Sequence, residues 1–516
     1  MSAKKQKANS TPKMKLGIVS FTDPRREVHL IKKREEYIRK NHLELKQKLE
    51  SDGFTVIDPQ TEFRKQNKNN EIWGINNIED VKEISKIYLH ENISAIILGC
   101  WAWNEPNVPL ALAKKMDVPI ALVTKNDPLW PGITAVTSTG ATFWQLSNNY
   151  HIKTHNRFIV SSKNDYQDLV SWARASCAVN YLRNGTLLLW GGSPALNMEH
   201  LNDDIPILKS FLIDDIITED QNTLIERVEL MLSKNQDRIS DFIKWLNENN
   251  CRIIYDNKMT TEDSIKKQIA LYFAAKDIIL QRIESGVSII GASIKCQPEL
   301  SINYGVTGCL IPAFLPFPFD SEGEKPITST TCEGDIKGLL TSALLFGLNK
   351  EIPPLFGDLK VITEDYFVIA NCGGASAFYA ANSNDPKISL SRSTIKPQCQ
   401  GESGGAFGFY TPTTPDEATF AQLIRLDGNY ILQFGVGKLS EKYQKPKNAW
   451  GESWPHTVVD LKIPKELFVK AIGSNHFSLI LGNFKNEMKY IAKILSIPTV
   501  ELDLAESVEG FLQNVN

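Results

Sequence analysis

The feature that most constrains the fold is a regular alternation of short apolar runs and longer amphipathic segments in the first quarter of the chain. The apolar runs cover residues 15–21, 53–57, 93–99 and 118–124, and the amphipathic segments cover about 28–49, 78–90 and 108–115. Strands that alternate with helices in this way predict a doubly wound α/β domain with a parallel sheet. Ligands of such sheets bind at the carboxyl ends of the strands. The loops at 22–27 and 100–107 are therefore candidate binding segments.

The alternation resumes further along the chain and then stops. Predicted helices near 167–183, 224–231, 241–249 and 265–285, with strands at 185–192 and 287–294, indicate a second α/β unit. After about residue 350, Gly, Pro, Ser and Thr become dense and short alternating strands follow, such as 418–426 and 429–439, before a helix at 485–495. We expect an α/β protein with two doubly wound α/β domains (14–165 and 166–350) and a β-rich, barrel-like C-terminal domain (351–516), after a disordered leader (1–13).

The composition excludes several classes of protein. With 57 Lys and Arg against 60 Asp and Glu in 516 residues, the net charge is −3, which gives no reason to expect nucleic acid as a partner. The eight Cys show no CxxC spacing, so a structural zinc site is not expected and the thiols are typical of a reduced, cytoplasmic protein. The polar first 13 residues do not resemble a signal peptide, and no apolar run reaches the roughly 18 residues of a membrane span.

Candidate chemistry is concentrated around two acidic residues between a Thr-rich strand and an apolar helix, Glu333 and Asp335. Each has an ordinary alternative, because acidic residues at a helix start often cap the helix. Asp358 and His476 have such alternatives too, as a turn residue and as a core or surface histidine. Two carboxylates and one imidazole would suit Mn²⁺ or Mg²⁺ better than Zn²⁺. Spacings of 25 and 118 residues follow no local motif, however, so sequence physics alone does not assemble this set.

A family resemblance brings these residues together. The motifs that carry it are DPRRE (23–27), GCWAW (99–103), the segment 172–194, CEGDIKGLL (332–340), FGDLKV (356–361), ESWPHT (452–457), and SNH with the later ILSIPTVEL (474–502). In this order and with this spacing the chain resembles an L-fucose isomerase, within the fold family that also holds L-arabinose isomerase. An arabinose isomerase of the usual type would carry two Glu and two His ligands, so the fucose-type set matches better.

The resemblance implies a role for each matching residue. It makes Glu333, Asp358 and His476 the ligands of a Mn²⁺ ion, with Mg²⁺ or another divalent ion as alternatives, and Asp335 a second acid nearby. Glu333 and Asp358 would also be the catalytic residues. The residues that it places around the substrate are Arg25 or Arg26, Trp101, Gln297, Trp454 and Asn475.

The implied activity is aldose–ketose isomerisation of an open-chain monosaccharide through a cis-enediolate, in carbohydrate metabolism. The implied assembly is a homo-oligomer, a trimer or hexamer, in which Arg25, Arg26 and Trp101 reach the metal of a neighbouring subunit. The sugar stays open, whether neutral, deoxy or anionic, because residues 372–410 do not follow the family closely. Two other functions also stay open: a catalytically silent sugar-binding or regulatory protein, and a metal-dependent epimerase or hydrolase on the same scaffold.

Overall fold

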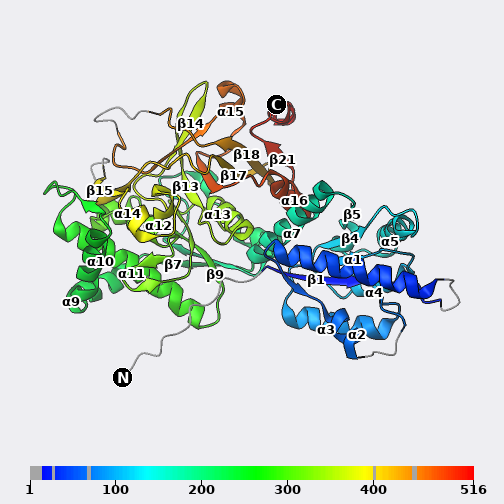
Figure 1. Ribbon diagram of the computed structural model, residues 1–516. Helices are drawn as coiled ribbons and strands as arrows, with labels where there is room; N and C mark the ends of the chain where they lie inside the picture. Colours follow the sequence, from blue (N-terminus) through cyan, green and yellow to red (C-terminus); the bar gives the residue numbers. More distant parts are fainter. Residues whose placement is uncertain (1–13, 26–29, 67–70, 399–402, 444–449, 516) are drawn as a thin grey trace. The chain divides into compact units, whose positions relative to one another are not determined.

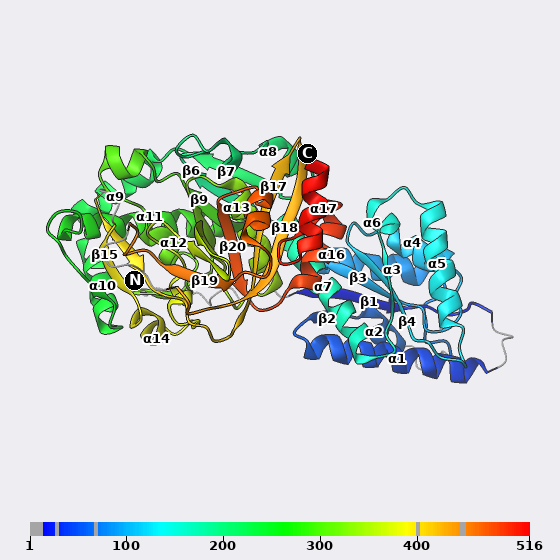
Figure 2. The ribbon, with the colours of Figure 1, turned by 90° about the horizontal axis from the view of Figure 1, so that it is seen from above.

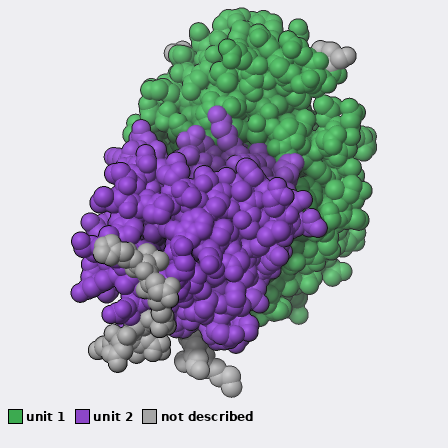
Figure 3. Space-filling model, turned by 90° about the vertical axis from the view of Figure 1, so that its right-hand side faces the viewer, with its two compact units in different colours: residues 1–9, 181–485, 497–516 green, residues 10–180, 486–496 purple. Residues whose placement is uncertain are grey.

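The computed structural model describes residues 14–25, 30–66, 71–398, 403–443 and 450–515. The predicted leader at 1–13 lies outside these residues. The chain divides into a large unit, built mainly from Tyr181–Lys485 and Ile497–Asn516, and a small unit, built from Ser10–Asn180 and Asn486–Ser496 (Figure 3). This division is coarser than the three expected domains, whose boundaries remain predictions.

The small unit contains a five-stranded sheet in the order β2-β1-β3-β4-β5, and all its neighbouring strands are parallel. This is the flavodoxin-like order of doubly wound folds. The strands are β1 (Lys15–Ser20), β2 (Thr55–Ile57), β3 (Ala95–Gly99), β4 (Ile120–Thr124) and β5 (Asn156–Ile159). The helices are α1 (Ile31–Ser51), α2 (Pro59–Gln66), α3 (Ile78–Glu91), α4 (Asn107–Ala113), α5 (Gly132–Leu146), α6 (Tyr150–Lys153), most of α7 (Lys163–Arg183) and α16 (Lys485–Leu495).

Alternate strand residues of this sheet enter two separate cores. Ile18 and Ile97 pack with residues of α1 and α7, whereas Val19 and Leu98 pack with residues of α3, α4 and α5. Successive side chains of a strand point to opposite faces, so helices cover both faces of the sheet (Figures 1 and 2). Neither face of the sheet meets water, which explains why the sequences of these strands are continuous apolar runs.

The large unit contains a four-stranded parallel sheet in the order β12-β9-β6-β7. Its strands are β6 (Thr186–Trp190), β7 (Asp215–Glu219), β9 (Ile289–Ile294) and β12 (Ser329–Cys332). The helices of this part are α8 (Ile205–Phe211), α9 (Asn222–Lys234), α10 (Gln236–Glu248), α11 (Glu262–Glu284) and α12 (Leu310–Phe314), with short helical turns η1 (Glu199–Leu201) and η2 (Glu299–Tyr304). The second parallel α/β arrangement is thus confirmed.

A seven-stranded sheet, β19-β14-β13-β20-β17-β18-β21, forms the strand-rich C-terminal region. Its strands are β13 (Leu355–Ile362), β14 (Tyr366–Ala370), β17 (Glu417–Leu426), β18 (Asn429–Lys438), β19 (His456–Asp460), β20 (His476–Leu481) and β21 (Thr499–Glu501). All neighbours are antiparallel except β18 and β21. Within the described residues the sheet stays open, with β19 and β21 at its edges, so the expected β-rich region is present without a closed barrel.

The apolar helix α13 (Ile336–Leu348) contacts strands of both large-unit sheets: β9 and β12 of the parallel sheet, and β13, β17 and β20 of the seven-stranded sheet. Almost all of its residues are buried. A helix that is apolar on all sides is one that is enclosed. Its first turn therefore lies where the two sheets come together.

Five small strands and four helical segments complete the fold of the described residues. The remaining elements are β8 (Arg252–Ile253), β10 (Phe319–Asp320), β11 (Gly323–Glu324), β15 (Thr394–Pro397), β16 (Gly405–Gly408), η3 (Ala377–Ala380), α14 (Pro386–Leu390), α15 (Lys465–Ala471) and α17 (Ala505–Val515). Among the described residues, no helix combines the length and apolar character needed to cross a bilayer.

Candidate active site

The connection from β12 to α13 positions the two acidic residues that the sequence singled out. Glu333 and Gly334 both have left-handed backbones, with φ of 64° and 69°. A Cβ on residue 334 would lie 2.4 Å from the carbonyl oxygen of Gly192, so only glycine fits there. Glu333 has a Cβ, and its left-handed conformation costs of order 1–2 kcal/mol.

The capping alternative holds for one of the two acids. Asp335 is the N-cap of α13, and its Oδ1 accepts a hydrogen bond of 2.7 Å from the backbone N–H of Gly338. Its other oxygen, Oδ2, lies 2.8 Å from Nδ1 of His476. Glu333 lies two residues before Asp335, outside the helix. Asp335 therefore both starts the helix and orients the histidine.

Strand pairing brings Asp358 and His476 together across 118 residues of sequence. Asp358 lies in β13 and His476 is the first residue of β20, and the two are direct partners in the antiparallel ladder. The side chain of Asn475 donates a hydrogen bond of 2.7 Å to Oδ1 of Asp358. The side-chain oxygen Oδ1 of Asn475 lies 2.8 Å from Nε2 of His200, a contact that the sequence did not indicate.

Glu333, Asp358 and His476 converge on one point. Nε2 of His476 lies 3.1 Å from Oε2 of Glu333 and 3.3 Å from Oδ1 of Asp358. One ligand atom from each residue lies within 4.8 Å of the other two. Octahedral ligands about 2.1 Å from an ion are about 3.0 Å apart when adjacent. The distances from Nε2 of His476 to Oε2 of Glu333 and to Oδ1 of Asp358, 3.1 Å and 3.3 Å, are close to that value.

Two buried atoms of this set lack the partner that burial requires. Among the described residues, neither Oε2 of Glu333 nor Nε2 of His476 makes a hydrogen bond, although the two atoms are close. Such atoms cost about 1–3 kcal/mol each when left unsatisfied. A cation between them would satisfy both, and carboxylate oxygens with one imidazole are ligands that Mn²⁺ and Mg²⁺ accept. The three residues therefore fit the metal that the resemblance implies.

The pKa of His476 also indicates that this cluster favours a positive charge. Burial disfavours its charged form, but Asp358, Asp335 and Glu333 outweigh that effect and raise the pKa of His476 well above its ordinary value. The cluster thus attracts one positive charge in the absence of an ion. Because Asp335 accepts from Nδ1, the other ring nitrogen is the one directed at Glu333 and Asp358.

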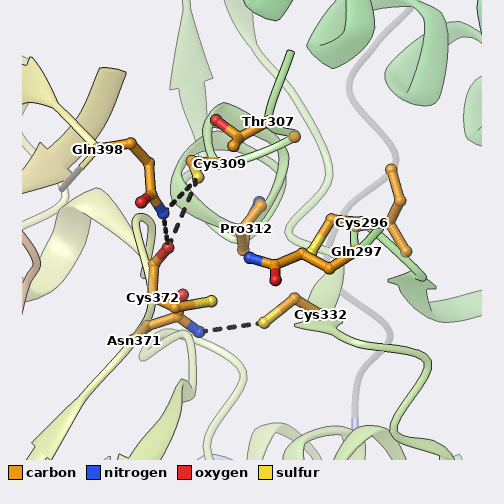
Figure 4. A pocket seen from close by; sticks show the side chains of 11 residues that line it. Cys296, Gln297, Thr307, Cys309, Pro312, Cys332, Asn371, Cys372 and Gln398 are labelled. Carbon is orange, nitrogen blue, oxygen red and sulfur yellow. Dashed lines mark hydrogen bonds between the residues drawn. The ribbon is translucent and has the colours of Figure 1, made fainter. Parts of the chain in front are cut away.

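The residues expected around the substrate divide between the two units. Gln297 follows β9 and lines a small cavity with Cys332 and Cys372 (Figure 4). Trp454 is 3% exposed and donates from Nε1 to the carbonyl oxygen of Gln398 at 3.0 Å. Both belong to the large unit, as do the three metal-ligand candidates. Their contact with a sugar remains a prediction.

The predicted residues of the small unit lie at the carboxyl edge of its sheet. Trp101 follows β3, is 1% exposed and donates from Nε1 to Oγ of Ser20 at 2.9 Å. Arg25 follows β1, has a side chain that is 61% exposed and pairs with Asp23 at 2.6 Å. Arg26 lies outside the described residues. The roles of these three residues toward a sugar also remain predictions.

Two features near the site could not be predicted from the sequence. One is the close approach of the carbonyl oxygen of Gly192 to the turn at Gly334. The thiols of Cys332 and Cys372 lie next to Glu333, and Cys372 is 3.6 Å from its Oε1. No local pattern indicated this cluster, because its members come from different strand ends.

Comparison with known proteins gives one result for the chain. A family model described as L-fucose isomerase, C-terminal domain, matches residues 369–503. No curated protein matches the chain significantly. The matched range contains His476 and Trp454, whereas Glu333 and Asp358 precede it. The similarity of residues 369–503 to this domain supports the predicted assignment of the chain to the L-fucose isomerase family.

Proposed function

We propose that the protein is a divalent-metal-dependent aldose–ketose isomerase that acts on an open-chain monosaccharide. The observation that carries the proposal is the convergence of Glu333, Asp358 and His476, two of them with buried, unpartnered ligand atoms. The family match at residues 369–503 supports sugar isomerisation as the class of reaction. Binding a sugar without turnover would not require this set of ligands.

Each residue then has a chemical task. Glu333, Asp358 and His476 would hold the ion, Mn²⁺ by preference, which when bound would polarise the sugar carbonyl. Asp335 holds the imidazole of His476 in one orientation. Asn475 fixes the carboxylate of Asp358 in the same way. The ligand atoms are thus positioned before any substrate arrives.

The isomerisation itself needs two proton movements. Glu333 would take the proton from C2 of the aldose and return it to C1, through a cis-enediolate of the sugar. Asp358 would move the hydroxyl proton between O1 and O2.

Substrate recognition follows the resemblance. Gln297 would donate a hydrogen bond to a sugar hydroxyl, Trp454 would offer an apolar face to its C–H edge, and Asn475 would contact it beside the metal. A trimeric or hexameric assembly would bring Arg25 and Trp101 to the site of a neighbouring subunit. An active monomer would contradict that last point.

The test is an NMR assay in D₂O with Mn²⁺-loaded protein and a panel of L- and D-aldoses, including 6-deoxy and 6-anionic sugars. A ketose with solvent deuterium at C1 is the expected product, and Glu333→Gln should abolish it. Glu351→Gln, an exposed position of the same unit, is the matched control and should retain activity. If no sugar is converted although the ion is bound, the silent sugar-binding protein becomes the better hypothesis. An epimer or a hydrolysis product would identify the third alternative.

A further inference from the structure

A group of thiols, three of them buried and Cys309 half-buried, lies beside the candidate metal ligands and has no part in the proposed isomerisation. Cys296, Cys309, Cys332 and Cys372 line one cavity of about 10 Å³ in the large unit (Figure 4). That volume suits a single water molecule or ion and no larger ligand. Scattered buried cysteines usually act as small apolar residues, but two of these thiols, Cys332 and Cys372, also lie close to a carboxylate.

The spacing of the nearest members matches a tetrahedral site for a soft cation. Sγ of Cys332, Sγ of Cys372 and one carboxylate oxygen of Glu333 all lie within 4.8 Å of one another. Sγ of Cys372 is 3.6 Å from Oε1 of Glu333. With metal–sulfur and metal–oxygen bonds of about 2.3 and 2.1 Å, the edge of a tetrahedron between S and O is about 3.6 Å.

Side-chain amides contact the thiol of Cys332 and the backbone of Cys372. Nδ2 of Asn371 donates to Sγ of Cys332 at 3.5 Å and to the carbonyl oxygen of Phe356 at 3.3 Å. Nε2 of Gln398 donates to the carbonyl oxygen of Cys372. A metal binds the thiolate form of cysteine, and an N–H group can donate to the sulfur of a metal-bound thiolate. Asn371 thus contacts the thiol of Cys332 directly, whereas Gln398 fixes the backbone of Cys372.

The two oxygens of Glu333 face different partners. Oε2 lies 3.1 Å from Nε2 of His476, and Oε1 faces Cys372. The oxygen and nitrogen ligands on one side suit a hard ion, and the sulfur ligands on the other suit a soft one. A single carboxylate thus belongs to two ligand sets of opposite character.

We propose that Cys332, Cys372 and Glu333 form a second metal site, for a thiophilic divalent cation of the Zn²⁺ and Cd²⁺ class, with Cys296 as the nearest further thiol. Each thiol that binds gives its proton to solvent, so the ion is held by thiolates and one carboxylate. This site does not depend on the proposed isomerase activity, because its ligands can be tested by metal binding alone. Its charge would act on Glu333, which connects it to the first site.

The experiment is a titration of the purified, reduced protein with Cd²⁺, followed by the ultraviolet charge-transfer band of cadmium thiolates. We expect a saturable band in the wild type and in His476→Ala, which removes a ligand of the hard site only. Cys332→Ser and Cys372→Ser should weaken cadmium binding about 10-fold or more. Cys251→Ser, at a fully buried thiol outside the cavity, is the matched control and should leave the band unchanged.

Two results would overturn the proposal. One is a band that persists in the Cys332→Ser/Cys372→Ser double variant, and the other is a band that Cys251→Ser removes as fully. Should the serine variants fail to fold, the ¹¹³Cd NMR shift of the wild-type protein decides the question without any substitution. A shift typical of sulfur ligation supports the thiol site, and a shift typical of oxygen and nitrogen ligands alone refutes it.

Discussion

Replacing Asp335 by Asn tests whether this residue prepares His476 for a metal. The carboxylate makes two contacts, from Oδ1 to the backbone N–H of Gly338 at 2.7 Å and from Oδ2 to Nδ1 of His476 at 2.8 Å. Asn retains one acceptor and can still cap α13. Its amide nitrogen cannot accept from Nδ1, so the second contact is lost.

We expect Asp335→Asn to weaken metal binding and to leave the stability of α13 nearly unchanged. Loss of a carboxylate that orients a metal-binding histidine typically weakens metal affinity 10–100-fold, which corresponds to about 1.4–2.7 kcal/mol. Replacement of one good N-cap residue by another changes helix stability by much less than the roughly 1 kcal/mol lost with Ala. Mn²⁺ affinity should therefore fall while the helical circular dichroism stays the same.

Equilibrium dialysis with Mn²⁺ measures the affinity directly, without a sugar substrate. The matched control is Asp204→Asn, the same substitution at the N-cap of α8, where the side chain accepts from the backbone N–H of Ile207. That variant should bind Mn²⁺ like the wild type. An Asp335→Asn protein whose affinity stays within about twofold of the wild type would refute the orienting role.

Two predictions concern stability. Gly334→Ala should lower the free energy of unfolding in urea by more than about 2 kcal/mol. A left-handed alanine costs about 1–2 kcal/mol, and its Cβ would also overlap a carbonyl oxygen at 2.4 Å. The control is Gly428→Ala, where φ is 80° but the space is open, so only the cost of the left-handed backbone should be lost. Burial lowers the pKa of Lys325 from 10.5 to about 7. Between these pH values the unfolded chain therefore binds one more proton than the folded protein. The free energy of unfolding of the wild type then rises with pH, by up to about 1.4 kcal/mol per pH unit. Lys325→Met should lack this gain, so the difference in unfolding free energy between variant and wild type should change in favour of the wild type from pH 7 to 9; parallel pH profiles would contradict the burial of a neutral amine.

The parts of the fold that could be predicted are those in which local pattern and burial agree. The helix predicted at 485–495 coincides with α16, and the four strands of the first domain lie within a few residues of their predicted ranges. In contrast, α5 was not predicted. Its sequence, GITAVTSTGATFWQL, is rich in Thr and Gly, which have low helix propensity, so packing rather than propensity determines its conformation.

The candidate site shows why long-range pairing could not be predicted from local sequence. The turn after β12 was correctly placed between a strand and a helix, but the left-handed backbone of Glu333 has no local signal, since non-glycine residues seldom adopt it. Asp358 and His476 meet through the register of β13 and β20, which depends on the whole sheet. Only the family resemblance connected these positions in the sequence, and the strand pairing now supplies the physical reason for their proximity.

The two proposed metal sites lead to one argument about selectivity. The side chain of Glu333 is buried, with one oxygen facing His476 and the other facing Cys372. Hard ions should then bind beside His476 and Asp358, and soft ions beside Cys332 and Cys372. Glu333 is common to both sets, so the other ligands decide which ion each site prefers. A thiophilic ion bound at the thiols would place positive charge beside Glu333, and a carboxylate next to a second cation is a weaker base. The same turn that would position the catalytic carboxylate would thereby make it sensitive to soft metals.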